Sequence, residues 1–207
     1  MERRRGISTN FKEKEGVSIL QVKTFNIQKT NIIEKGIGTL AIEYQYLSAI
    51  KKYTSDKKFD LVLYSTPPIT FAKVIEFVKK RDHAKSYLLL KDIFPQNAVD
   101  MNMLKNGGFL HRQFVRKEKK LYQISDTIGC MSEANVDFIL KHNPEINKSK
   151  VEVNPNTIEP VVFNYSDEQK KSIREKYQIP TDKKVFVYGG NLGKPQGLDF
   201  LLETIST

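Results

Sequence analysis

Short apolar runs alternate with longer amphipathic stretches along most of the chain. The runs that read as strands cover residues 17–25, 59–64, 87–90, 127–131, 150–153 and 185–188. The stretches between them place apolar residues at the three- and four-residue spacing of a helix, as in 40–53 and 71–78. Apolar strands that alternate with helices predict an α/β fold with a Rossmann-like, doubly wound parallel sheet.

Side chains that cap helices mark where several of these helices begin. Thr66, followed by Pro67 and Pro68, fits an N-cap with proline in the first turn. Ser132 is placed to cap the helix after the strand at 127–131, with Glu133 in its first turn. The sequence Ser-Asp-Glu-Gln at 166–169 predicts a capping box that opens a helix running to about Tyr177.

Ligands of open parallel sheets bind beyond the carboxyl ends of the strands, so the loops at that edge are the first places to look for a site. These loops are 65–68, 91–100, 132–135, 154–159 and 189–197. Asp92 follows an apolar strand directly, and a carboxylate there could orient or deprotonate a substrate hydroxyl. An aspartate that only fixes the loop explains the same residue equally well.

The turn Gly-Gly-Asn-Leu-Gly-Lys-Pro-Gln-Gly at 189–197 lies between an expected strand and an expected helix from about Gln196 to Ile205. Backbone N–H groups of such a turn, together with the positive end of the helix, suit a phosphate or diphosphate group. The glycine spacing matches neither a Walker loop nor the dinucleotide-binding pattern. An ordinary tight turn remains the alternative.

The chain carries a formal net charge of +10, which favours an anionic partner or simply a lysine-rich solvated surface. Residues 105–120 contain six lysine or arginine side chains and one glutamate, with apolar side chains between them. A basic amphipathic helix of this kind can lie on an anionic membrane. It can equally pack one face on the sheet and solvate the other.

Several classes of protein and site are not expected from the composition. The longest aliphatic run, Leu88–Leu90, is far too short to span a bilayer, and no apolar segment follows the basic start at 1–5 as in a secretory signal. Cys130 is the single cysteine, so no internal disulfide can form. The three histidines lack ligand spacing, so we expect no metal and no cofactor. A cytoplasmic protein, with a peripheral position on the inner face of the plasma membrane, fits best.

Four segments, taken in order, resemble the family 4 glycosyltransferases, in particular the branch that builds capsular and O-antigen polysaccharides. They are YGGNLGKPQGLDFLL at 188–202, LLLKDIFPQ at 88–96, IGCMSEAN at 128–135 and VEVNPNTIE at 151–159. The resemblance extends over nearly the whole chain from about Val17. It implies a hexosyltransferase-type enzyme that transfers a sugar from a nucleotide-sugar donor, with retention of configuration and without metal, to a lipid-linked glycan acceptor.

The resemblance also implies an organisation in two Rossmann-like domains. Residues 1–160 correspond to an incomplete acceptor-side domain, 161–183 to a linker with a helix, and 184–207 to the start of the nucleotide-sugar-binding domain. Asp92 takes the catalytic position. By the same resemblance, the residues that bind the donor diphosphate are Gly190, Asn191, Leu192, Lys194 and Gln196. The acceptor-side loops contain the candidate site residues Thr66, Pro67 and Ser132. Asn191 stands where the family commonly has an arginine, which leaves Lys194 as the loop's one cation.

The family's first strand and its paired donor-site glutamates have no counterpart in the sequence, so the resemblance predicts a fragment shortened at both ends and inactive by itself. Two other functions stay open. A non-catalytic basic module could bind a membrane or nucleic acid, although no nucleic-acid-binding signature is present. A sugar-nucleotide epimerase would share the two-domain architecture.

Overall fold

A computed structural model describes residues 9–24, 32–193 and 196–206, with the main chain alone for 32–40. The chain divides into two compact units, Met1–Asn156 and Thr157–Thr207, and each is described by itself. Among the described residues, no helix combines the length and apolar character needed to cross a membrane.

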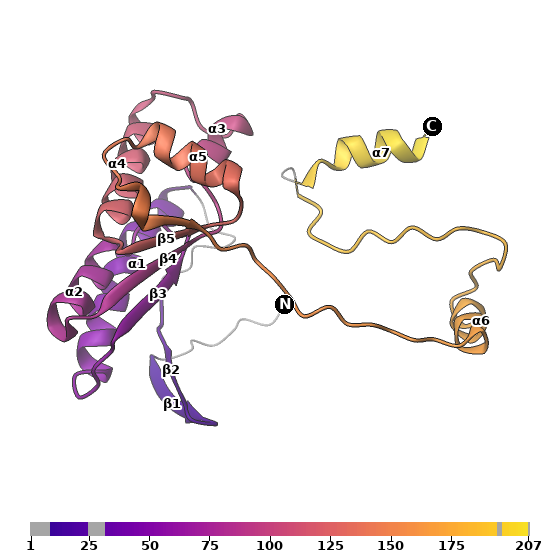
Figure 1. Ribbon diagram of the computed structural model, residues 1–207, viewed down its shortest axis with the longest axis horizontal. Coiled ribbons are helices and arrows are strands. Elements are labelled where there is room, and N and C mark those ends of the chain that lie inside the picture. Colours follow the sequence, from indigo (N-terminus) through magenta and orange to yellow (C-terminus); the bar gives the residue numbers. More distant parts are fainter. Residues whose placement is uncertain (1–8, 25–31, 194–195, 207) are drawn as a thin grey trace. The chain divides into compact units, whose positions relative to one another are not determined.

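A four-stranded parallel sheet forms the centre of the first unit (Figure 1). Its strands are β3 (Leu61–Ser65), β4 (Lys85–Leu90), β5 (Thr127–Cys130) and β6 (Val151–Val153), and they lie side by side in sequence order. Leu88 pairs with Tyr64 on one side and with Ile128 on the other. The predicted α/β class and Rossmann-like parallel sheet are confirmed.

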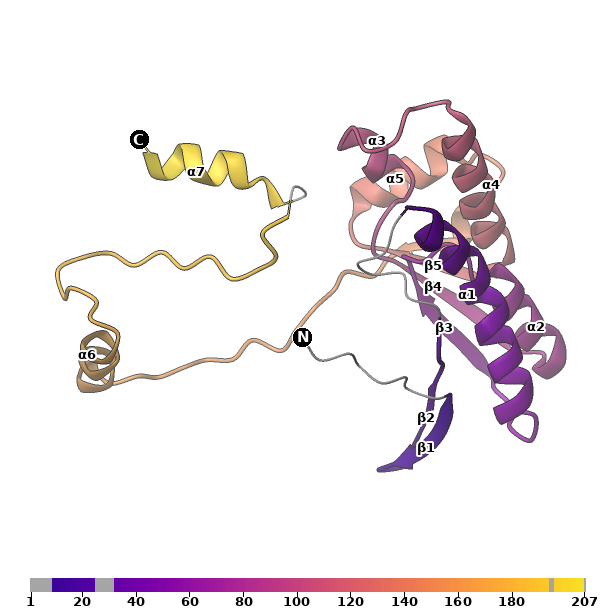
Figure 2. The same cartoon turned by 180° about the vertical axis from the view of Figure 1, so that it is seen from behind.

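Helices connect the strands and stand together along one side of the sheet (Figure 2). They are α1 (Ile32–Tyr53), α2 (Ala72–Asp82), the short α3 (Gln96–Asp100), α4 (Phe109–Ile124) and α5 (Glu133–His142). A single 3-10 turn, η1 (Lys148–Lys150), leads into β6. Because sequential parallel strands need crossovers of the same hand, helices that connect strands in this order all fall on the same face.

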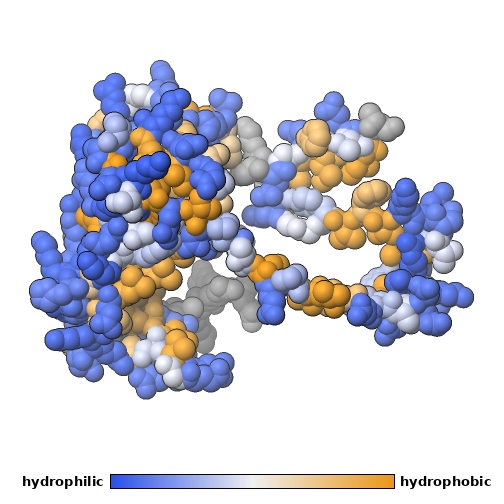
Figure 3. Space-filling view, in the orientation of Figure 1, coloured by the Kyte–Doolittle hydropathy of each residue, from blue (hydrophilic) through white to orange (hydrophobic). Residues whose placement is uncertain are grey.

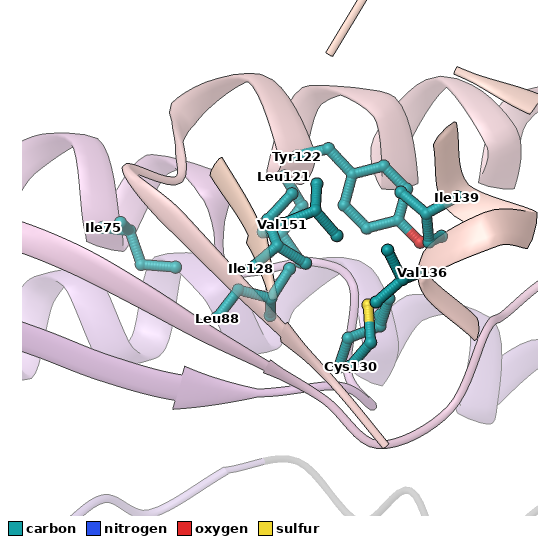
Figure 4. Close-up of a cluster of buried hydrophobic side chains, with 10 residues drawn as sticks. Ile75, Leu88, Leu121, Tyr122, Ile128, Cys130, Val136, Ile139 and Val151 are labelled. Carbon is teal, nitrogen blue, oxygen red and sulfur yellow. The ribbon is translucent and has the colours of Figure 1, made fainter. Parts of the chain in front are cut away.

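The hydrophobic core lies between this helical layer and one face of the sheet (Figure 4). Alternate residues of β4 and β5, led by Leu88 and Ile128, are fully buried beneath α2, α4 and α5. The helices contribute apolar side chains at helical spacing to the same cluster: Ile75, Leu121, Tyr122, Val136 and Ile139. Burying a side chain of leucine size stabilises a fold by roughly 1.5–3 kcal/mol, so this layer holds the unit together.

The other face of the sheet is more open than the sequence predicts. Leu61 and Leu63 of β3 point away from the core and are 53% and 59% exposed. Their neighbours Val62 and Tyr64 alternate to the helical side and pack against the core cluster. Continuous apolar character in β3 therefore does not by itself mean burial on both faces.

The strand expected at 17–25 forms in part, but not within the parallel sheet. Residues Val17–Gln21 make β2, which pairs antiparallel with β1 (Asn10–Lys14) in a separate two-stranded sheet. Glu15 and Gly16 both have positive φ, the backbone that a two-residue hairpin turn requires. Residue 25 lies outside the described residues.

A polar cluster fixes the amino-terminal edge of the sheet. The Asp126 carboxylate accepts hydrogen bonds from the Ser86 backbone at 2.8 Å and from the Ser86 hydroxyl at 2.9 Å, and it pairs with the Lys79 ammonium at 2.8 Å. Burial alone would raise the pKa of Asp126, but the bonds from Lys79 and Ser86 outweigh it and lower that pKa. The cluster ties β4, α2 and the start of β5 together.

The second unit contains two helices, α6 (Asp167–Lys176) and α7 (Leu198–Ser206). The predicted capping box at α6 is confirmed, because the Ser166 hydroxyl and the Gln169 side chain each bond to the other's backbone. No strand forms at 185–188, where Phe186 and Val187 are 91% and 85% exposed. A strand needs a neighbour for its backbone hydrogen bonds, and none pairs with this segment in the described unit.

The start of the helix that follows β3 was predicted wrongly, and the helix expected over 40–53 begins earlier, at Ile32. The helix expected to begin at Thr66 begins instead at Ala72, and its N-cap Phe71 has no side-chain cap. Thr66 and Pro67 each precede a proline, which disfavours helical backbone at both residues. The segment between β3 and α2 is consequently an extended loop at the carboxyl edge of the sheet.

Candidate functional site

The carboxyl edge of the parallel sheet brings together three of the residues singled out from the sequence. Thr66 follows the last residue of β3, and Asp92 and Ser132 each follow their strand by two residues. Leu90 of β4 pairs with Cys130 of β5, so Asp92 and Ser132 occupy equivalent positions beyond neighbouring strands. The fold therefore places side chains from three successive loops along one edge.

The Thr66 side chain locks the loop that carries Asp92. Thr66 is buried, and its hydroxyl donates to the Asp92 carbonyl at 3.0 Å while accepting from the Asp92 backbone N–H at 3.4 Å. The Asp92 side chain itself is exposed and makes no hydrogen bond to the described part of the chain. A fixed backbone with a free carboxylate is what a residue that contacts substrate requires.

Ser132 and Pro67 have different surroundings at the same edge. The Ser132 hydroxyl accepts from the Asn135 backbone N–H at 3.3 Å as the N-cap of α5, as the sequence predicts. Pro67 is exposed next to the buried Thr66. Capping α5 is thus a structural role that explains a serine at position 132. Any contact of Ser132 with a substrate would use the remaining hydrogen-bonding capacity of its hydroxyl.

A second polar group, on the open face of the sheet, was not found from the sequence. The Tyr87 hydroxyl donates to the Glu152 carboxylate at 2.6 Å and accepts from the Asn154 amide at 2.8 Å. Burial, with the bond to Glu152 next, raises the pKa of Tyr87. A Cβ at Gly129 would lie 2.5 Å from the Tyr87 hydroxyl, so Tyr87 crosses β5 only because residue 129 is glycine. A glycine inside a strand was the available signal.

The residues expected to hold a diphosphate lie in the second unit. Gly190, Asn191 and Leu192 are exposed, and so is Gln196, whose backbone N–H bonds to the Gly193 carbonyl. The Tyr188 hydroxyl donates to the Asn191 carbonyl at 3.0 Å. Lys194 lies outside the described residues. The turn precedes α7, as expected, but no sheet supports it within this unit.

Helix α4 carries the basic cluster, and only some of its cations are paired. Lys119 pairs with Glu145 at 3.0 Å and Lys120 with Glu76 at 2.5 Å. Arg112 and Arg116 are exposed without an ion-pair partner in the described part of the chain. Apolar side chains are exposed beside them, with Phe109 at 75% and Leu110 at 59%.

Histidine, cysteine and acidic side chains do not gather in any group of three or more that could hold a metal ion within the described ranges. Cys130 is fully buried in the core, and burial raises its thiol pKa to about 11. A thiol in this state is a packing residue rather than a nucleophile. The chemistry that the carboxyl edge offers is therefore that of hydroxyl, amide and carboxylate groups.

Comparison with known proteins gives one similarity that spans most of the chain. No protein-family profile matches it. Over 179 residues, 86% of the chain, it is 25% identical to a protein of Pseudomonas aeruginosa described as "Probable glycosyltransferase WbjE". The chain spans 43% of that protein's length. The chain thus combines a Rossmann-like sheet, with loop side chains at its carboxyl edge, with a sequence similar to that of a probable glycosyltransferase.

Proposed function

We propose that the chain forms part of a glycosyltransferase that moves a sugar from a nucleotide-sugar donor to a glycan acceptor. The observation that carries the proposal is the similarity to the Pseudomonas protein, which extends over 179 residues, 86% of the chain. The placement of Thr66, Asp92 and Ser132 along one sheet edge supports it, since ligands of such sheets bind there.

In this proposal Asp92 is the catalytic residue. Its carboxylate orients or deprotonates the attacking hydroxyl of the acceptor, and the Thr66 hydroxyl holds the Asp92 backbone in place. Pro67 and Ser132 border the acceptor on either side. General base catalysis by a positioned carboxylate contributes roughly 10²- to 10⁴-fold to a rate.

The test is a chimera in which this chain replaces the aligned stretch of the Pseudomonas protein. We expect it to release nucleotide from one member of a nucleotide-sugar panel in the presence of a glycan acceptor. Asp92→Asn should lower kcat by about 100-fold or more with little change in the donor KM. Asp56→Asn, an exposed aspartate before β3, is the matched control. A folded chimera without transfer from any donor contradicts the proposal.

On the donor side we infer that backbone N–H groups of Gly190, Asn191 and Leu192 bind the diphosphate, with help from Lys194 and the Gln196 amide. Reaction with retention and without metal, by a hexosyltransferase-type enzyme, follows from the family resemblance. Exposed charge pairs contribute only about 0–1 kcal/mol each, so the chain alone should bind donors weakly and transfer no sugar. Micromolar donor binding by the isolated chain, measured by calorimetry, argues against this assignment.

The acceptor that fits best is a glycan on a polyprenyl diphosphate, used to build capsule or O-antigen at the inner face of the plasma membrane. The start of α4 supports this assignment, because it exposes Phe109 and Leu110 next to Arg112 and Arg116, which form no ion pair with the described residues. Apolar side chains beside cations are typical of helices that lie in the interface of an anionic membrane. Peripheral attachment through α4 would bring the sheet edge to a lipid-linked substrate.

Liposome sedimentation tests the attachment. We expect the chain to bind vesicles that contain anionic lipid, with binding that weakens as salt rises. Replacing Phe109 and Leu110 by alanine should reduce binding several-fold, because buried apolar area contributes to interfacial affinity. Leu61→Ala, at an exposed leucine of β3, is the control. Equal binding to vesicles of neutral lipid would show that the basic side chains of α4 do not contribute to the attachment.

A further inference from the structure

A cavity of about 350 Å³ lies between α3, α4 and α5, and Asp92 is not among the residues that line it. Side chains at helical spacing on α4 form one wall, including His111, Glu118 and Lys119, and α5 supplies His142 and Asn143. Its volume falls in the range of roughly 300–1,000 Å³ found for small-molecule sites. None of the roles proposed above uses these side chains.

Glu118 provides the one carboxylate among the side chains that line this cavity. The Tyr122 hydroxyl donates to its Oε1 at 2.8 Å, and Tyr122 is itself buried in the core. The nearest cation on the same wall, Lys119, is engaged with Glu145 at 3.0 Å. Burial raises the pKa of Glu118 to about 7, against the lowering effects of Tyr122 and Lys119. The charge of Lys119 is thus shared between Glu118 and Glu145, and no salt bridge to Glu118 forms within the described residues.

Two of the three amides in the wall each donate one N–H to another protein group. Gln96 donates through Nε2 to the Asp100 carboxylate at 2.7 Å, and Asn143 donates through Nδ2 to the Ile139 carbonyl at 3.0 Å. An amide that has spent an N–H in this way keeps its carbonyl oxygen as an acceptor. Both residues therefore offer acceptors to the cavity.

The histidines differ in the atoms they leave available. His142 Nδ1 lies 2.8 Å from the Phe138 carbonyl, which can only accept, so Nδ1 carries the proton and Nε2 remains an acceptor in the neutral ring. His111 Nδ1 accepts from the Gly107 backbone N–H at 3.3 Å, so its Nε2 is a donor. Several acceptors consequently face the cavity, and the strongest of them is the Glu118 carboxylate.

We propose that this cavity binds a small ligand with a protonated primary amine and neighbouring hydroxyl groups, with the ammonium facing Glu118. An ammonium supplies three donors and a full positive charge close to a half-buried carboxylate. The hydroxyls can donate to the oxygens of Gln96 and Asn143 and to Nε2 of His142. The proposal does not depend on sugar transfer by the sheet edge.

Calorimetric titration of the full chain at pH 8 with D-glucamine (1-amino-1-deoxy-D-glucitol) and with D-glucitol tests the charge requirement. The two probes share their open-chain hydroxyls and differ in the amine, which in D-glucamine is an alkyl ammonium that stays protonated at pH 8, so we expect D-glucamine to bind at least tenfold more tightly. Equal affinity, or no binding of either, would overturn the proposal. Glu118→Gln should remove the preference, whereas Asp137→Asn, an exposed aspartate on α5, should leave it unchanged.

A pH series on the unsubstituted chain tests the same site without a variant. The charged or titratable groups that face Glu118 are His111, Lys119 and Tyr122 of α4 and His142 of α5, while α3 contributes only uncharged side chains. Burial raises the pKa of Glu118 to about 7, and protonation removes the charge that attracts an ammonium, so the affinity for D-glucamine should fall several-fold from pH 8 to pH 5.5. Affinity that is constant or rises in acid would refute the assignment.

Discussion

The two units of the chain contain similar apolar segments, but the segment in the first unit is buried and the segment in the second is exposed. Leu88 of β4 is fully buried between two neighbouring strands and the helical layer. The segment at 185–188 is as apolar as β4, yet Phe186 and Val187 are 91% and 85% exposed. Figure 3 shows hydrophobic surface along this stretch of chain between α6 and α7. Apolar sequence therefore produces a strand only where other strands can satisfy its backbone and helices can cover its side chains.

Substitutions of large apolar side chains should show the largest difference in stability between the two units. Leu88→Ala removes a fully buried side chain and should lower the free energy of unfolding by about 2 to 5 kcal/mol. Phe186→Ala removes a larger side chain that is exposed, and we expect a change within about 0.5 kcal/mol. Urea unfolding followed by circular dichroism measures both. A comparable loss from Phe186→Ala would show that the second unit also has a core.

Glycines give the next comparison. A Cβ on Gly129 would meet the Tyr87 hydroxyl at 2.5 Å and the Asn154 Cβ at 2.9 Å, whereas one on Gly189 meets nothing within 4 Å. Gly129→Ala should cost about 1 to 3 kcal/mol, because Tyr87 must leave its bonds to Glu152 and Asn154. Gly189→Ala should change stability by less than about 0.5 kcal/mol. If the Gly129→Ala and Gly189→Ala variants unfold at the same temperature, the close packing of Tyr87 against β5 is contradicted.

The pH dependence of stability should arise in the first unit. Burial raises the pKa of Glu118 from 4.5 to about 7, so between these values the folded chain holds the proton more tightly than the unfolded chain. Stability should therefore fall as pH rises through this window, by about 1 to 2 kcal/mol once partial solvent screening is allowed for. Glu118→Gln should flatten the profile between pH 4.5 and 7. In the second unit the Ser166 hydroxyl lowers the pKa of the exposed Glu168, and Glu168→Gln should leave the profile unchanged.

Loss of a helix cap should give the smallest change in stability of these substitutions, and the most local one. Ser132 and Ser166 cap α5 and α6 through the same bond from hydroxyl to backbone, at 3.3 Å in both cases. Ser132→Ala should lower the stability of the whole first unit by about 1 kcal/mol, because α5 packs on the core. Ser166→Ala should reduce only the helix content of α6, seen in Cα chemical shifts. A shift of the sheet's unfolding midpoint by Ser166→Ala would mean that the two units unfold together.

Local patterns predicted much of the architecture. The strands at 59–64, 87–90, 127–131 and 150–153 and the capping residues Ser132 and Ser166 depend on nearby sequence, and the structure contains them with small shifts in their bounds. The glycine-rich turn also precedes a helix, as expected. These features follow from hydrophobic periodicity and from side chains that bond to their own helix.

Contacts between segments that are distant in the sequence could not be predicted from such local patterns. Thr66 looked like a helix cap, but its hydroxyl bonds to the Asp92 backbone, 26 residues away. The Tyr87 bonds to Glu152 and Asn154 join residues more than 60 positions apart. The cavity that Glu118 lines likewise depends on how α3, α4 and α5 meet.

The sequence by itself determined the α/β class, the order of most strands and helices and the sequence position of Asp92 after an apolar strand. The tertiary structure decided which apolar runs become strands, which faces are buried and which polar side chains meet at the sheet edge and in the α3–α4–α5 cavity. The reason is that helix periodicity and capping act within a few residues, whereas strand pairing and burial need partners that only the folded chain brings together.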